Sequence, residues 1–276
     1  MRVSSVALLK FFKKVPLDMI TVQDVEVFKQ KRLVTKSPRT KRLLKPATVN
    51  RELACLRQLI NYFIRNEVVT LNPVTSIKFL AENNEQTRVI SFDEQKKYLA
   101  ECSQPLRNVA ALMLETGMRP DELYRLRVRN VNLKAGWLFN PHGKTKAAKR
   151  RIPLTATARS ILHKRVLTAN GPYVFGSEKD PNKPITQLNK SHGTAVKRSG
   201  VDDFRLYDLR HTFATRAIEA GVDLITLAAL LGHSRIAMVQ RYAHPGEQHK
   251  VEAVQKMEAM CAEKEKQEER AAAATQ

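Results

Sequence analysis

The chain has 276 residues, and its 48 Lys and Arg against 27 Asp and Glu give a formal net charge of +21. With 43% apolar and 27% charged residues, 10 glycines and 12 prolines, its composition excludes a disordered or collagen-like chain. No apolar run approaches the roughly 18 residues of a membrane span, so no membrane partner is expected. The three cysteines are far apart, which argues against a disulfide framework or a zinc site and indicates a reducing cytoplasm.

The positive charge is spread over two parts of the chain. Residues 1–80 carry 16 basic and 5 acidic side chains, residues 81–250 carry 28 and 16, and residues 251–276 carry 4 and 6. Two basic bodies and a near-neutral tail predict a clamp around nucleic acid, because each neutralised phosphate releases counterions. An anionic membrane surface is the alternative polyanion, but no lipidation motif or strongly amphipathic basic helix supports it.

The first 80 residues are predicted to be helical. Thr21 can cap a helix over residues 22–33. Thr48 can begin a second, amphipathic helix, which the Asn72-Pro73 pair ends.

A strongly basic stretch joins these two helices. From Lys31 to Arg51 there are eight Lys or Arg and no acidic residue. The stretch is either a solvated loop or a phosphate-contacting one, and uncompensated charge beside helix starts favours phosphate contact. DNA contacts are therefore predicted from Lys36, Arg39, Lys41, Arg42, Lys45 and Arg51.

The polar segment 81–88 lacks apolar periodicity and is the predicted linker to a second domain, 89–247. Ser91 and Glu94 form a capping-box pattern that begins the next helix, and a longer apolar helix ends at Gly117.

Further along, strand-like segments flank a basic turn and predict a hairpin. The strands are expected at 137–139 and 151–154, helices near 156–167, 186–198, 208–220, 223–231 and 235–242, and a tail helix over 248–276. The expected fold class is mainly α with a small β-sheet: a helical DNA-binding domain and a mixed α/β domain.

An arginine lies at a predicted helix start in T-G-M-R-P-D-E-L. Because Pro120 suits the first helical turn, Arg119 would lie beside free backbone N–H groups, an arrangement that can bind an anion. The alternative is a surface arginine paired with Asp121 or Glu122.

The turn of the predicted hairpin, residues 142–151, holds five basic residues and no acid. A lysine in such a turn can enter a DNA groove and donate a proton to a leaving alkoxide. A solvated turn is an equally good interpretation of the turn taken alone.

Two later segments place polar groups at helix ends. Arg210 and His211 lie at the start of a helix with an apolar face. Polar side chains at such a position suggest that they are buried for a functional reason. His233 lies in a turn after a glycine, and Tyr242 follows nine residues later. A single tyrosine at a helix end usually serves packing.

Together, two arginines, a lysine, a turn histidine and a tyrosine are the groups that covalent phosphoryl transfer requires. Arginines stabilise a pentacoordinate phosphate, a tyrosine supplies the nucleophile, and a lysine or histidine moves protons. Neither a metal nor another cofactor is expected.

The motifs T-G-M-R-P-D-E-L, Y-D-L-R-H-T-F-A-T, L-L-G-H-S and R-Y-A-H, in this order, resemble the tyrosine recombinase (phage integrase) family over about residues 90–245. The resemblance implies a core DNA-binding domain over 1–80, with the T-V-N-R-E-L and N-P-V signatures, and a catalytic domain over 89–247. It assigns the phosphate clamp to Arg119 and Arg210, support of the first arginine to Glu122, the second-histidine position to His233, the nucleophile to Tyr242, and the general acid to Lys144 or, two residues later, Lys146.

One position departs from the family pattern. Many members have a histidine three residues before the second arginine, where this chain has Tyr207. A phenol can hydrogen-bond a phosphate oxygen but cannot form an imidazolium, so the role of this position is open. His211 is interpreted as a structural neighbour rather than as a replacement for the histidine that many members have at position 207.

The implied activity is site-specific recombination of double-stranded DNA. Tyr242 would attack a phosphate, release a 5′-hydroxyl and hold a 3′-phosphotyrosyl bond. The implied assembly is a homotetramer on paired DNA sites, weakly associated or monomeric without DNA, and nucleoid-associated. The tail helix is expected to dock on a neighbouring protomer, and folding back onto its own catalytic domain is the alternative. The alternatives are a relaxing topoisomerase of type IB character and a catalytically silent DNA-binding protein, although the complete residue set argues against silence.

Overall fold

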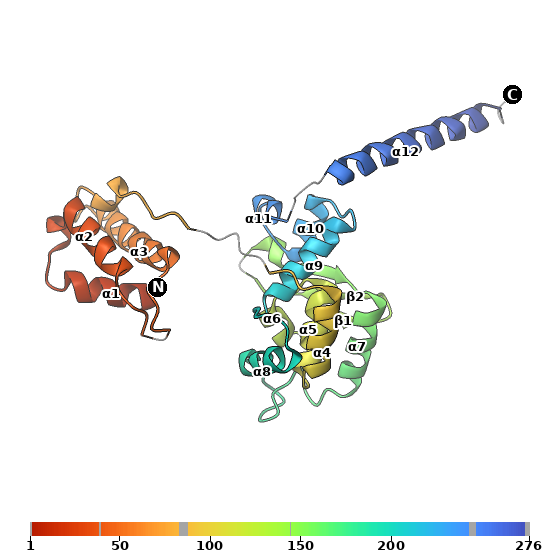
Figure 1. The fold of residues 1–276 in the computed structure, drawn as a ribbon, viewed down its shortest axis with the longest axis horizontal. Coiled ribbons are helices and arrows are strands. Elements are labelled where there is room, and N and C mark those ends of the chain that lie inside the picture. The colour runs from red at the N-terminus through yellow and green to blue at the C-terminus, as the bar shows by residue number, and fades with distance from the viewer. Residues whose placement is uncertain (1, 39, 83–87, 144, 243–246, 274–276) are drawn as a thin grey trace. The chain divides into compact units, whose positions relative to one another are not determined.

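The computed structural model describes residues 2–38, 40–82, 88–143, 145–242 and 247–273, and Figure 1 labels its α-helices and two of its strands. The chain divides into two compact units, Met1–Gln86 and Thr87–Gln276. The division falls inside the polar segment 81–88. Among the described helices, none is both long and apolar enough to span a bilayer.

The first unit is a small helical bundle. Its elements are α1 (Arg2–Phe12), η1 (Leu17–Met19), α2 (Val22–Leu33), α3 (Pro46–Arg65) and η2 (Pro73–Ser76). α3 packs against α1, α2 and η2, and it buries Val49, Leu53 and Ile60 completely. These residues recur at helical spacing, so one face of α3 supplies much of this core.

The ends of the helices in this unit follow from local chemistry. The predicted cap is confirmed: the Thr21 hydroxyl accepts a hydrogen bond from the backbone N–H of Asp24, and the carboxylate of Asp24 accepts one from the backbone N–H of Thr21. α3 begins at Pro46, two residues before the predicted start at Thr48. Proline suits this position because the first helical turn leaves its N–H groups without intrahelical acceptors.

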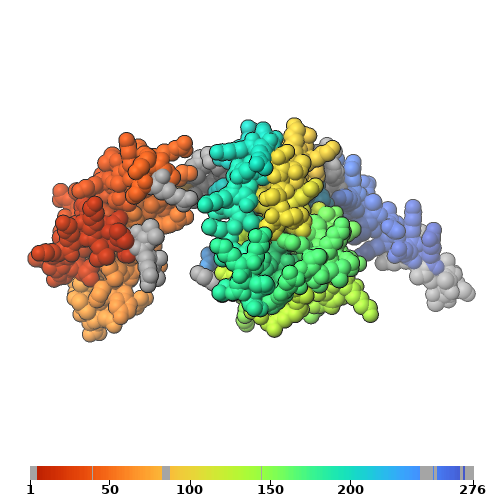
Figure 2. All heavy atoms as spheres, turned by 90° about the horizontal axis from the view of Figure 1, so that it is seen from below, coloured from red at the N-terminus to blue at the C-terminus, as the bar shows by residue number. Residues whose placement is uncertain are grey.

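The second unit is built around α5. Its helices are α4 (Phe92–Glu101), α5 (Leu106–Thr116), α6 (Pro120–Tyr124), α7 (Ala156–Leu167), α8 (Asn189–Ser199), α9 (Asp208–Glu219), α10 (Leu224–Leu231), α11 (Ala237–Gln240) and α12 (Glu247–Ala273). α5 contacts α4, α6, α7 and α9, and its apolar side chains are buried. Figure 2 shows the face of this unit on which α4 (yellow) and α8 (blue-green) lie side by side.

A three-stranded antiparallel sheet covers part of this core. Its strands are β1 (Val131–Asn132), β2 (Trp137–Asn140) and β3 (Arg150–Pro153), in the order β1-β2-β3. The predicted hairpin of β2 and β3 is confirmed, with Leu138 opposite Ile152 and Asn140 opposite Arg150. The first pair is apolar and joins the core, whereas the second pair is polar and buried at the turn end.

Left-handed glycines end the two helices that point at the polar cluster described below. Gly117, with φ of 63°, ends α5, and Gly232, with φ of 68°, ends α10. Glycine adopts this conformation without the steric cost that a Cβ adds. Each turn leaves carbonyl groups at the helix end free to accept hydrogen bonds from side chains.

The last helices of the second unit form a separate small core. Leu227 and Leu231 of α10 pack with Ala214 of α9, Val239 of α11 and Tyr242. The helix predicted over 235–242 is present as the four residues of α11, because Ser234–Ile236 form a turn instead. The tail forms α12 as expected, and its apolar stripe of Val251, Val254, Met257 and Met260 is exposed.

Candidate active site

Arg210 is the centre of a polar cluster inside the second unit. It lies in the first turn of α9 and is 1% exposed. Nη1 donates to the carbonyl of Gly117 at 2.6 Å, and Nη2 donates to the carbonyl of Leu231 at 2.7 Å. The guanidinium therefore joins the C-terminal ends of α5 and α10 to the first turn of α9.

This arginine keeps its positive charge at neutral pH despite its burial. Burial, followed by the charge of Arg119, lowers the pKa of Arg210 to about 10. An arginine fixed by two carbonyl groups is a preorganised donor, because it need not rearrange when an anion arrives.

Arg119 and Glu122 lie at the two ends of the first turn of α6. Arg119 Nη1 donates to Glu122 Oε1 at 2.9 Å, and its backbone N–H donates to Oε2 at 3.0 Å. Glu122 is buried, whereas the Arg119 side chain is 30% exposed. The predicted pairing of Arg119 with a neighbouring carboxylate is thus present, and it leaves the arginine accessible from one side.

Arg150 is a member of the cluster that the sequence analysis did not single out. It is buried, with Nη1 and Nη2 donating to Glu122 at 3.2 and 3.1 Å, and Nε donating to the carbonyl of Leu230 at 2.6 Å. One signal could have revealed it: residues two apart on a strand share a face, so Arg150 faces inward with Ile152.

Glu122 is ionised between these two arginines. Burial acts to raise its pKa, but hydrogen bonds and charge from Arg150, and then from Arg119, outweigh burial, so the pKa is lowered. One carboxylate among three guanidinium groups leaves a net positive charge, which suits a phosphate.

His233 lies in the turn after α10 and faces Arg210. Its Nε2 is 2.9 Å from Arg210 Nη2 and accepts the hydrogen bond, which places the ring proton on Nδ1. Nδ1 is buried and has no partner among the described residues. Burial, then the charges of Arg210 and Arg119, lowers the pKa of His233 to about 4. The ring is therefore a neutral donor beside the arginines.

Tyr242 follows α11 and is 6% exposed. Its hydroxyl oxygen is 2.5 Å from Nδ1 of His211, on the turn of α9 that carries Arg210. Burial raises the pKa of Tyr242, against the opposing charge of Arg210. The sequence interpretation of His211 as a neighbour did not include this contact, because 31 residues separate the two side chains along the chain.

Tyr207 precedes α9 and is 37% exposed. Its ring meets the ring of His211 edge to face, with centroids 5.2 Å apart. Tyr207, His211 and Tyr242 therefore form a row of rings beside Arg210.

The hairpin lysines differ in how far the structure describes them. Lys144 lies outside the described residues. Lys146 begins the short helix η4 (Lys146–Ala148) in the turn between β2 and β3, and it is exposed.

The predicted DNA contacts lie in the first unit. Lys36, Lys41, Arg42, Lys45 and Arg51 are exposed, and Arg39 lies outside the described residues. Hydrogen bonds from Ser37 N–H to Arg42 and from Leu44 N–H to Thr35 fold the stretch into a short hairpin. Arg32, in contrast, binds buried Glu52 through two hydrogen bonds of 2.7 Å and links α2 to α3.

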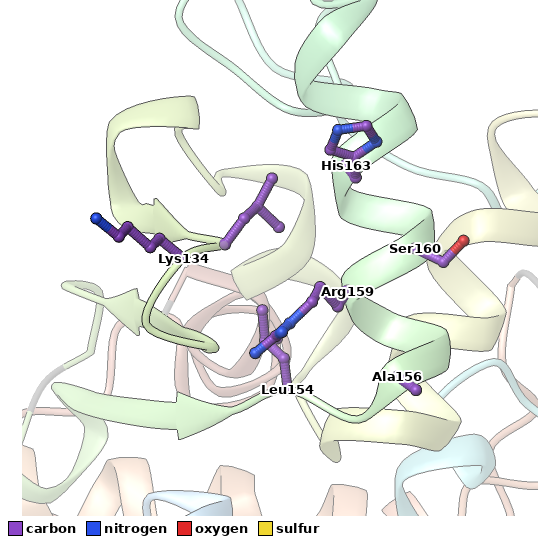
Figure 3. A pocket seen from close by; sticks show the side chains of 7 residues that line it. Lys134, Leu154, Ala156, Arg159, Ser160 and His163 are labelled. Atoms are coloured by element: carbon purple, nitrogen blue, oxygen red, sulfur yellow. The ribbon is translucent and has the colours of Figure 1, made fainter.

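A hollow of about 750 Å³ lies away from this cluster, between the β1–β2 turn and α7. Figure 3 shows its lining, which includes Lys134, Arg159 and His163 but none of the predicted site residues. Across the described residues, no group of three or more His, Cys, Asp or Glu side chains could hold a metal ion.

Comparison with known proteins identifies a family and a fold. Residues 83–249 match the model of the phage integrase family. The chain is 29% identical to an integrase of Salmonella phage P22 over 69% of its length, and 30% identical to a shufflon-specific DNA recombinase of Escherichia coli over 83%. It spans 52% and 59% of the lengths of these relatives. A Tn1549 transposon integrase, solved with a circular intermediate DNA, superposes with a TM-score of 0.75 at 16% identity over 93% of each chain, which shows a common fold.

The protein belongs to the phage integrase family, the tyrosine recombinases. Its fold is that of the family: mainly α, with a small antiparallel sheet in the unit that carries the arginine cluster.

Proposed function

We propose that the chain is a site-specific recombinase that cleaves and rejoins double-stranded DNA through a covalent tyrosine intermediate. Tyr242 attacks a backbone phosphate, a 5′-hydroxyl leaves, and the enzyme holds a 3′-phosphotyrosyl bond. A 5′-hydroxyl of another strand then displaces the tyrosine. Bond number is conserved, so the exchange needs no nucleotide energy source.

The observation that carries the proposal is the buried Arg210, held by two carbonyl groups and hydrogen-bonded to His233. Tyr242 packs in the small core that contains Leu231, one of the two residues whose carbonyl groups hold Arg210. We assign the nonbridging phosphate oxygens to Arg119, Arg210 and Nδ1 of His233, which has no hydrogen-bond partner in the described part of the chain. Charge that develops on these oxygens in the transition state would then meet donors already in place.

The remaining assignments concern the leaving group and Tyr207. We assign the proton for the leaving 5′ oxygen to a hairpin lysine, Lys144 or Lys146, since a flexible ammonium can reach the groove. We assign to the half-exposed Tyr207 a hydrogen bond to a phosphate oxygen.

We further propose a DNA-bound homotetramer. Exchange between two duplexes cuts four strands, and each chain carries one candidate nucleophile. The exposed cations of the 36–51 stretch contact DNA phosphates. The three cysteines are unpaired, which is compatible with action on nucleoid DNA in a reducing cytoplasm.

The test is a covalent adduct on a nicked suicide substrate, whose released fragment diffuses away and traps the intermediate. Purified protein should yield a band that resists denaturant and disappears after protease digestion. Tyr242→Phe should bind the same DNA without forming the band. A normal adduct yield from that variant would contradict the assignment of the nucleophile. Relaxation of supercoiled plasmid without strand exchange would identify a topoisomerase instead.

A further inference from the structure

His211 is buried next to the candidate nucleophile. Its Nδ1 lies 2.5 Å from the Tyr242 hydroxyl oxygen, and the two residues are 7% and 6% exposed. Their rings are tilted by 43°, with centroids 5.7 Å apart, so the contact runs through the hydroxyl rather than through stacked faces. Among the described residues, His211 is the hydrogen-bond partner of this hydroxyl.

The protonation states of the two groups suit transfer of a proton from the Tyr242 hydroxyl to the His211 imidazole. Burial and three nearby arginine side chains lower the pKa of His211 to about 4, although Asp208 acts in the opposite direction. Burial raises the pKa of Tyr242. At neutral pH a neutral imidazole therefore faces a protonated phenol, which is a proton acceptor facing a donor.

On the basis of the recombinase chemistry proposed above, we infer that His211 is the general base of the reaction. Its Nδ1 accepts the Tyr242 proton while the phenolic oxygen bonds to phosphorus and the bond from phosphorus to the 5′ oxygen breaks. That oxygen leaves as a hydroxyl with a proton from the hairpin lysine. In the reverse step the His211 imidazolium returns its proton to the departing tyrosine.

Substrate binding would favour this transfer. In the DNA-free chain, the positive charges of Arg241, Arg205 and Arg210 oppose a cation at His211. A phosphate bound by Arg210 and Arg119 brings negative charge to the same place. The imidazolium then costs less free energy, so the base becomes stronger when the scissile phosphate is present.

Tyr207 cannot serve as the general base, which is the role that we assign to His211. Its phenol cannot accept a proton to become a cation, and its ring packs edge to face on the imidazole. In this assignment Tyr207 is a positioning residue that holds the plane of the His211 ring toward Tyr242.

The chain offers a matched control in the same unit. Nδ1 of His192 lies 2.8 Å from the Tyr98 hydroxyl, and His192 is also 7% exposed. This second buried histidine–tyrosine pair joins α4 to α8. His192 Nε2 lies 2.8 Å from the carbonyl oxygen of Phe204, which is not part of the cluster around Arg210. His192→Asn therefore reproduces the structural loss without removing the base.

The experiment measures single-turnover adduct formation by His211→Asn and His192→Asn on the nicked substrate. Because a general base typically contributes about 10²–10⁴-fold, His211→Asn should be slower by at least about 10²-fold, with His192→Asn near the wild-type rate. Placing a ring-fluorinated tyrosine at position 242, whose hydroxyl is more acidic, should restore much of the rate of His211→Asn. A 5′-bridging sulfur, which removes the need for an acid, should not.

Each outcome decides the inference. Selective rescue by the acidic phenol supports it, and a wild-type rate in His211→Asn overturns it. Rescue by the bridging sulfur alone also overturns it, since the lost step would then be at the leaving group. If the Asn variant does not fold, His211→Gln takes its place and is judged by the same rescue. Failure of the wild-type chain to form any adduct would instead refute the proposed function.

Discussion

At the scale of single residues, the carboxylate of Glu122 partly neutralises the arginines of the site. It accepts hydrogen bonds from Arg119 and from buried Arg150. Removing one partner of a buried ion pair typically costs about 3–5 kcal/mol, because the other charge stays buried without compensation. We therefore expect Glu122→Gln to destabilise the second unit by an amount in that range and to slow cleavage.

Urea unfolding at pH 7 measures this loss. Asp121→Asn is the control, because Asp121 pairs with Arg125 on the surface, where both side chains are more than half exposed. Exposed pairs contribute about 0–1 kcal/mol, so the control should unfold close to wild type. Equal stability losses in the two variants would contradict the central role of Glu122.

The two site histidines make the second unit sensitive to acid. Their pKa values are lowered to about 4 from an ordinary value of 6.5. Between these values the unfolded chain binds more protons than the folded one, so folding stability falls as the pH drops from 6.5 toward 4. His233→Gln should flatten this part of the curve. Melting temperatures of both proteins between pH 4 and 7.5 test the expectation, and parallel curves would refute it.

The sequence pattern singled out most residues of the cluster around Arg210, but it did not predict their hydrogen-bond and ion-pair partners. Arg119, Arg210, His233 and Tyr242 stand out by type and spacing. The ion pair of Arg150 with Glu122, 28 residues apart, and the contact of His211 with Tyr242 depend on how separate elements pack. Periodicity along a strand or helix carries no information about such long-range partners.

At the scale of elements, the turn after α10 determines where Arg150 lies. A Cβ added to Gly232 would come within 2.7 Å of Arg150 Nη1 and 3.0 Å of the Ala147 carbonyl oxygen. Gly232→Ala should therefore add a clash with β3 to the conformational cost of a left-handed residue, about 1–2 kcal/mol. We expect reduced cleavage as well as reduced stability, because Arg150 and His233 must both move.

Gly200 provides the matched control for this change. It ends α8 with φ of 66°, and an added Cβ there would meet nothing within 4 Å. Gly200→Ala should show the conformational cost alone and cleave DNA normally once folded. Thermal unfolding and adduct yield of both variants make the comparison. The clash argument fails if the two glycines respond alike.

Local signals predicted most element boundaries. Ser91 and Thr21 cap helices as their sequence patterns indicate, and the β2–β3 hairpin lies where its strand-like segments predict. β1 has two residues and carries too little periodicity to be predicted. α11 is shorter than predicted, because packing of Val239 and Tyr242 against α10, rather than helix propensity, shapes that segment.

At the scale of the whole molecule, the excess positive charge should appear in the salt dependence of DNA binding. Log K for duplex DNA falls with log salt concentration by about 0.9 for each phosphate neutralised. Replacing the exposed Lys36, Lys41, Arg42 and Lys45 by Gln should reduce this slope by about 0.9 for each that contacts phosphate. Fluorescence anisotropy at several salt concentrations measures it. Lys264→Gln with Lys266→Gln on α12 is the control, and equal slopes in all three proteins would place the stretch in solvent.

The exposed stripe of α12 bears on assembly. Val251, Val254, Met257 and Met260 are each more than half exposed, although a helix rarely leaves such a stripe without a partner. An isolated helix is only marginally stable in water, so burial of this stripe would stabilise α12. We expect the burial to occur against a neighbouring protomer on DNA, which would link the segment after Tyr242 to the assembled complex.

Val254→Asp with Met257→Asp should therefore leave binding to a single DNA site unchanged and reduce pairing of two sites and strand exchange, because a buried carboxylate would oppose docking. Ala259→Asp places one such carboxylate on another face of the exposed helix and should recombine normally. Gel shifts with one-site and two-site DNA separate binding from pairing.

Truncation after Gly246, which lies outside the described residues, should act like the double variant. Normal recombination by the truncated chain would contradict docking between protomers. Unfolding of the truncated monomer would mean instead that α12 stabilises its own chain.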